Sequence, residues 1–272
     1  MARTNKKACL KLRPLALAGC FAFLGLSPLE AEKAGKLQPP VVAAPQGTLE
    51  LSPECRYSGT ALASLAPLPN TIRAIRERRS VRLLAIGATP VARRARSGGG
   101  YDLLTEALLE KAIKGLVIDV IERGVSGELA DGAAERLKIE VALTNPDLVL
   151  WQVGTNDAMA HIPLSDIEET ITSTVRWLKE HRVDVILVGL RYSRRMRQDR
   201  HYQSVRKLID SIAKSQAIMR IGRYDATEIR RRAAAEDHPS INGWLEQAEE
   251  SYDCLAEYVA KGIATVLFAR EP

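Results

Sequence analysis

Residues 148–161, LVLWQVGTNDAMAH, run from a continuous apolar segment into a small polar loop. A continuous apolar run, without polar residues at alternate positions, is typical of a strand covered on both faces in a parallel sheet. In such sheets the loops at the carboxyl ends of the strands form the binding site. The stretch therefore predicts a buried strand that brings Asn156 and Asp157 to the edge of a functional site.

The rest of the chain alternates between apolar, β-rich runs and helical periodicity. The predicted strands are 81–86, 116–121, 147–153, 183–190 and 217–221, and the predicted helices are 101–114, 128–143, 165–181, 203–215 and 246–268. Strands that alternate with helices indicate a parallel sheet with helices on both faces. We therefore predict an α/β fold, a three-layer α/β/α sandwich around a five-stranded parallel sheet.

The N-terminus has the layout of an export signal. Five Lys or Arg residues precede an apolar stretch from Leu15 to Leu26, and the small residue Ala31 follows. This layout predicts a signal peptide over 1–31 and a periplasmic or secreted protein. Residues 17–20, Leu-Ala-Gly-Cys, also resemble a lipoprotein cleavage box, and the alternative is a protein anchored through an acylated Cys20.

Residues 32–52 are rich in Pro, Ala, Gln and Lys and lack periodicity, so we predict a flexible linker there and a folded domain over 53–272. No apolar stretch of the predicted mature chain reaches the roughly 20 residues of a membrane-spanning helix. Without residues 1–31 the formal charge falls from +6 to +2. The basic clusters at 93–96 and 191–200 lack interleaved aromatic residues, so nucleic acid is not an expected partner.

Two cysteines remain after the predicted signal peptide. Cys55 and Cys254 form an even pair in a chain expected in an oxidising compartment, which predicts a disulfide. The alternative is two unpaired buried thiols. No His or Cys neighbours have the spacing of metal ligands, and we predict neither a metal nor another cofactor.

Four blocks carry a family resemblance: AIGATP (85–90), RGVSGE (123–128), WQVGTND (151–157) and YDCLAE (252–257). In this order they resemble an exported bacterial branch of the SGNH (GDSL-type) hydrolase superfamily, from about Cys55 to Val266. Together with the alternation, the resemblance implies a flavodoxin-like strand order, with 81–86 beside 147–153. It also implies an ester hydrolase ancestry.

The resemblance implies an oxyanion site. In the family, the residues at the positions of Gly127 and Asn156 donate hydrogen bonds to the oxyanion of the acyl intermediate, together with the backbone N–H of the nucleophile. Thr89 stands where the family has its nucleophilic Ser. A Thr hydroxyl can act as a nucleophile beside a base, but its methyl group restricts χ1 and crowds the approach, and the alternative is an ordinary loop residue.

The family's catalytic base is not recognisable. The resemblance implies an Asp-x-x-His motif shortly before the last block, and no such motif occurs in the chain. The one candidate base is His238, with Asp237 directly before it. His161, His181 and His201 have no partner at a useful spacing in the sequence, and each is expected to be a surface polar residue.

These features favour a catalytically degraded esterase that binds an acylated or carbohydrate small molecule, or an envelope protein, through the retained loops. The alternative is a weak GDSL-type ester hydrolase that uses Thr89 as nucleophile with His238. A third hypothesis is a purely structural envelope protein.

Overall fold

A computed structural model describes residues 49–56, 63–87, 100–192, 195–225, 227–228 and 242–268. The strands are β1 (Ala63–Ser64), β2 (Ser80–Gly87), β3 (Val117–Gly124), β4 (Leu148–Gln152), β5 (Asp184–Val188) and β6 (Met219–Ile221). The helices are α1 (Pro69–Arg78), α2 (Tyr101–Ala112), α3 (Ala130–Thr144), α4 (Thr155–Met159), α5 (Leu164–Glu180), α6 (Arg200–Ser215) and α8 (Asn242–Phe268). Short 3₁₀ turns cover Pro53–Cys55 and Arg195–Gln198.

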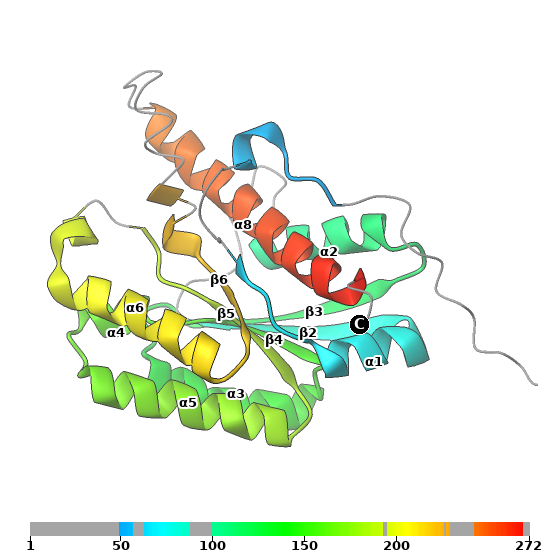
Figure 1. Cartoon of the computed structure of the whole chain (residues 1–272), viewed down its shortest axis with the longest axis horizontal. Coiled ribbons are helices and arrows are strands. Elements are labelled where there is room, and N and C mark those ends of the chain that lie inside the picture. Colours follow the sequence, from blue (N-terminus) through cyan, green and yellow to red (C-terminus); the bar gives the residue numbers. More distant parts are fainter. Residues whose placement is uncertain are drawn as a thin grey trace, which may run out of the picture. The chain divides into compact units, whose positions relative to one another are not determined.

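The sheet has the order β1-β6-β5-β4-β2-β3 (Figure 1). All neighbouring strands are parallel except β1, which pairs antiparallel with β6. The five parallel strands have the predicted flavodoxin-like order, and β2 lies beside β4, with Leu84 opposite Val149. The predicted fold class is thus confirmed, and the two-residue strand β1 adds an antiparallel edge.

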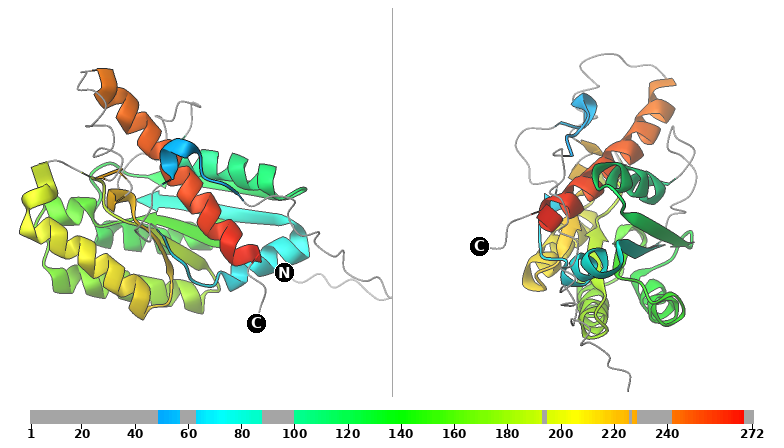
Figure 2. Two further views of the ribbon diagram at one scale, coloured as in Figure 1. Left: turned by 45° about the horizontal axis from the view of Figure 1, so that its top comes forward. Right: turned by 90° about the vertical axis from the view of Figure 1, so that its right-hand side faces the viewer.

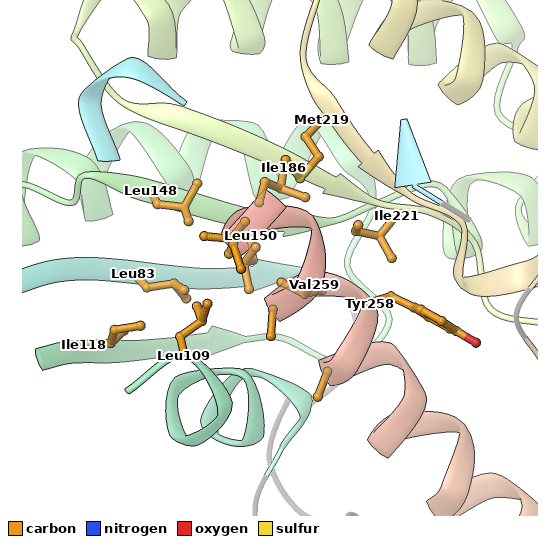
Figure 3. Packing of buried hydrophobic residues seen from close by; sticks show 14 of the residues in the cluster. Leu83, Leu109, Ile118, Leu148, Leu150, Ile186, Met219, Ile221, Tyr258 and Val259 are labelled. Atoms are coloured by element: carbon orange, nitrogen blue, oxygen red, sulfur yellow. The ribbon is translucent and has the colours of Figure 1, made fainter. Parts of the chain in front are cut away.

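Helices cover both faces of the sheet (Figure 2). Apolar side chains of α1, α2 and α8 pack on one face and those of α3, α5 and α6 on the other. Along β2, Leu83 and Ala85 belong to the first core and Leu84 and Ile86 to the second, which explains the unbroken apolar run. Figure 3 shows the first core, where Val259 of α8 meets the sheet.

Sequence reasoning missed β1, α1 and α4. Two residues in β1 are too few to show a period of two, and α4 has only five residues. Helix α1 is ten residues long and buries only Thr71, Ala74 and Ile75, so it lacks a strong apolar stripe. None of the described helices is long and apolar enough to cross a membrane.

The predicted disulfide is present. Cys55 and Cys254 are bonded, with 5.3 Å between their Cα atoms, and both are buried. Around this bond, Ser52 N donates to Glu257 Oε2 at 2.8 Å and the Tyr258 hydroxyl donates to Cys55 O at 2.7 Å. These contacts hold the segment before the first core strand against α8.

Candidate functional site

Three strands end together at one edge of the sheet. Gly87, the last residue of β2, is in register with Gly124 at the end of β3 and with Gln152 at the end of β4. Val125 N then donates to Gly87 O at 2.9 Å. The loops that follow β3 and β4 therefore start side by side, as expected for the carboxyl edge of a parallel sheet.

The candidate oxyanion donors are Gly127, in the loop after β3, and Asn156, in the first turn of α4. Asn156 Nδ2 donates to the carbonyl oxygen of Glu128, the residue after Gly127, at 2.9 Å. A carboxamide nitrogen carries two protons, so this bond orients Asn156 and leaves its second N–H available. Gly127 is exposed, and no acceptor for its N–H occurs among the described residues. The two candidate donors thus lie close together, and their use for an oxyanion stays a prediction.

Asp157 fixes the spacing of these two loops. Its Oδ1 accepts a hydrogen bond from Ala130 N, the first N–H of α3, at 2.8 Å, and the side chain is buried. Leu129 stands at the N-cap position of α3 and has no side chain that could accept this bond, so an acceptor from another loop replaces it. Burial raises the pKa of Asp157, and the Ala130 N–H opposes that rise.

Replacing Asp157 with Ala is expected to lower the free energy of unfolding by about 1–3 kcal/mol, because Ala130 N–H would stay buried without an acceptor. Asp157→Asn retains an acceptor oxygen, so it should lose clearly less. Urea unfolding of both variants measures the difference. Equal losses of unfolding free energy in Asp157→Ala and Asp157→Asn would show that the side-chain oxygen at position 157 does not stabilise the start of α3.

The other side of the third block is tied to the segment after β5. Thr155 Oγ1 accepts from Arg191 N at 3.0 Å, and Tyr202 of α6 donates its hydroxyl to Arg191 O. Gly154 has φ +94°, and a Cβ there would lie 2.4 Å from Ile209 Cδ1. The Gly-Thr-Asn-Asp sequence therefore has a structural reason at each position, besides the proposed use of Asn156.

The other candidate residues cannot be placed. Thr89, Asp237, His238 and Cys20 all lie outside the described residues. Their roles as nucleophile, base and lipid attachment point stay predictions. Within the described ranges, no three His, Cys, Asp or Glu side chains are grouped as a metal ion would require.

Of the three histidines expected at the surface, His161 and His181 are exposed and His201 is partly buried. The rings of His161 and His201 lie 5.1 Å apart, and His161 Nε2 is 3.9 Å from Asp199 Oδ2. His181 stacks on Trp177, one helical turn earlier, at 3.9 Å between ring centroids. The His181 contact has the i, i+4 spacing that sequence could have shown, whereas the first pair joins segments that are distant in the chain.

Sequence reasoning also missed a buried polar group beneath the carboxyl edge. It consists of the buried Tyr101 and Asp102 at the start of α2, the buried Arg223 after β6 and the partly buried Glu122 on β3. The one signal available was an acid in the first turn of the apolar helix that begins YDLLTEALL.

Comparison with known proteins assigns the chain to a family. The model of the Non-GDSL lipase-like family matches residues 54–267. The chain belongs to this family. This membership, together with the arylesterase relative described next, confirms the resemblance to SGNH-type hydrolases.

A curated arylesterase from Vibrio mimicus is 29% identical over 89 residues, which is 33% of this chain and 43% of that enzyme. The chain thus spans less than half of this relative. The acetylxylan esterase Axe2 from Geobacillus stearothermophilus superposes with a TM-score of 0.51 at 22% identity, over 65% of this chain and 94% of Axe2. An arginine variant of Axe2 matches at 24% identity and the same TM-score, over 63% and 92% of the two chains. These likenesses show the fold.

Proposed function

We propose that this chain is an exported protein of the SGNH hydrolase superfamily that binds acyl esters, acylated carbohydrates among them, without turning them over by a Ser-His-Asp relay. The observation that carries the proposal is the retained donor pair. Asn156, in the first turn of α4, is anchored on Glu128 O, next to Gly127, whose N–H is free among the described residues.

The donor pair supports recognition of an ester carbonyl. Donors preset toward a developing oxyanion are each worth about 10²–10³ in rate in acyl-transfer enzymes, and the same N–H groups can hold the carbonyl oxygen of a bound ester. The arylesterase and acetylxylan esterase relatives act on esters by name, which supports the same ligand class here.

The proposed loss of turnover rests on changes at the positions that supply the nucleophile and the base in the family. Thr89 replaces the Ser of the family, and the chain contains no Asp-x-x-His motif. Serine and aspartate variants of Axe2 are described as catalytic mutants of that enzyme, so the corresponding groups matter in a relative of the same fold. An oxyanion site alone leaves a residual acceleration of about 10³–10⁴ over water in triad enzymes, which is too small to register as turnover of most esters.

The test uses the protein without residues 1–31. Acetylated xylo-oligosaccharides and short-chain glycerol esters are titrated calorimetrically, and the same sample is exposed to a fluorophosphonate. We expect binding of at least one ester, no covalent labelling and no hydrolysis above background. Hydrolysis that disappears in both Thr89→Ala and His238→Ala would establish the alternative, a weak hydrolase with Thr89 as nucleophile. Absence of both binding and hydrolysis would favour the structural envelope protein.

Asn156→Ala is expected to weaken binding of the ester about tenfold or more, because the loss of one hydrogen bond to the carbonyl oxygen costs about 1.4 kcal/mol. Calorimetric titration measures the affinity. Ser126→Ala, in the loop that also carries Gly127, is the matched control and should bind as the unmodified protein does. Unchanged affinity in Asn156→Ala would place the ligand elsewhere.

The location is part of the proposal. The basic and apolar pattern over 1–31 supports export, and Cys20 offers the lipid-anchored alternative. Metabolic labelling with palmitate, in the unmodified protein and in Cys20→Ser, separates the two forms. Label that depends on Cys20 establishes the anchor.

A further inference from the structure

Two carboxyl groups meet beneath the carboxyl edge of the sheet. Asp102, the second residue of α2, is fully buried. Glu122 on β3 is in register with Ala85 of β2, a residue of the core beneath α2 and α8. Both carboxyl oxygens of Asp102 and Oε1 of Glu122 are buried and have no hydrogen-bond partner among the described residues. Glu122 is close enough to raise the pKa of Asp102. Nowhere in the described chain does Lys, Arg or His form an ion pair with either.

This arrangement favours a bound proton. Burial raises the pKa of Asp102 to about 7, and the neighbouring Glu122 carboxylate adds to the rise. The N–H groups of Asp102 and Leu103 in the first turn of α2 act in the opposite direction but are outweighed. Two carboxylates in contact repel each other, whereas one proton between them turns the contact into a hydrogen bond.

Other charged and titratable groups face the pair without neutralising it. Tyr101 is buried beside Asp102, and burial, followed by Asp102, raises the pKa of its phenol, while Arg223 opposes the rise. Arg223 is 4% exposed and donates from Nη2 to the Tyr252 hydroxyl at 3.0 Å. Its guanidinium carbon lies 5.0 Å from the centre of the Tyr252 ring. The guanidinium group is therefore held by Tyr252 of α8.

We propose that Asp102 and Glu122 form a proton-binding site, and that loss of the shared proton near neutral pH loosens the first turn of α2 from β3. Above that pH, two negative charges face each other where no cation is paired with them. Glu122 pairs with Ala85, close to the end of β2. The chain continues from β2 into the block that contains Thr89. The site therefore links the proton concentration to the packing of α2 at the functional edge.

The sign of the pH dependence follows from the direction of the shift. The pKa of Asp102 is higher in the folded than in the unfolded protein, so folding favours its protonated form. The stabilising effect of the proton is complete below the unfolded pKa of about 4 and is lost as the pH rises to about 7. Above that value the curve levels off.

The test compares chemical unfolding of the protein without residues 1–31 at pH 5.5 and pH 8. With a folded pKa of about 7 for Asp102, this group alone raises the unfolding constant about 30-fold between the two pH values. Asp102→Asn and Glu122→Gln should each remove most of that factor. Asp119→Asn neutralises an exposed carboxylate on the same strand and should retain it. Equal pH dependence in the unmodified protein and both pair variants would overturn the proposal.

Two measurements on the unmodified protein do not depend on the folding of any variant. Infrared spectra should contain the carbonyl band of a protonated carboxylic acid that disappears as the pH rises through about 7. Amide hydrogen exchange, corrected for its intrinsic pH dependence, should accelerate at pH 8 in the first turn of α2 more than in α5. Absence of a band that titrates near neutral pH, or unchanged relative protection of α2, would contradict the proposed site.

Discussion

Cys55→Ala is expected to lower the free energy of unfolding by about 5 kcal/mol, the largest single loss that we predict for stability. The bond joins residues 199 positions apart, so it removes much of the conformational freedom of the unfolded chain. In the chain-entropy account, the stabilisation grows with the logarithm of the loop length. Urea unfolding of the oxidised, unmodified protein and the variant measures the loss.

The second cysteine provides the control. Cys254→Ala breaks the same bond, so it should cost about as much as Cys55→Ala, and the double variant should cost little more than either single variant. Thiol titration of the denatured, non-reduced protein without residues 1–31 should find no free thiol. Additive losses, or two titratable thiols, would show that the two cysteines stabilise the fold separately as buried side chains.

The fold could be predicted to this extent because its parallel strands are covered on both faces. The run at 148–152 is buried at every position, so its residues are all apolar or large, and the strand can be recognised without knowing which elements pack on it. Helix α6 shows the same independence, because Tyr202, Val205 and Ile209 recur at helical spacing on its buried side. Helix α1 packs on the sheet with few apolar residues. Its position depends partly on hydrogen bonds from Thr71 to Asp184 of β5, a contact between distant residues that the local sequence does not indicate.

The candidate site was predictable only in part, for a related reason. Parallel strands bring their carboxyl ends to one edge, so the proximity of Gly127 and Asn156 follows from the order of the blocks. The cap that Asp157 provides to α3 joins residues 27 positions apart, and Asp102 of α2 lies near Glu122 of β3. Such contacts depend on register and on helix placement, neither of which is marked in the local pattern.

Gly87→Ala is expected to lower the free energy of unfolding by about 3–5 kcal/mol, the sum of a strained backbone and an overpacked contact. Gly87 has φ +145°, which side-chain-bearing residues rarely adopt. A Cβ at this position would lie 2.3 Å from Gln152 O and 2.9 Å from Gln152 Cβ. The obstructing oxygen belongs to the backbone of β4, which cannot move away without separating β2 from β4.

Gly127→Ala separates the two causes of that loss. Gly127 also has a positive φ, of +80°, but a Cβ there meets nothing within 4 Å. It should therefore cost only the backbone strain, about 1–2 kcal/mol. Equal losses in urea unfolding would show that the close approach of β4 is not what requires glycine at position 87. A much larger loss at Gly87 would mean that glycine is required there for β2 to pack against β4. The glycine of the first block would then have a structural role that does not depend on hydrolysis.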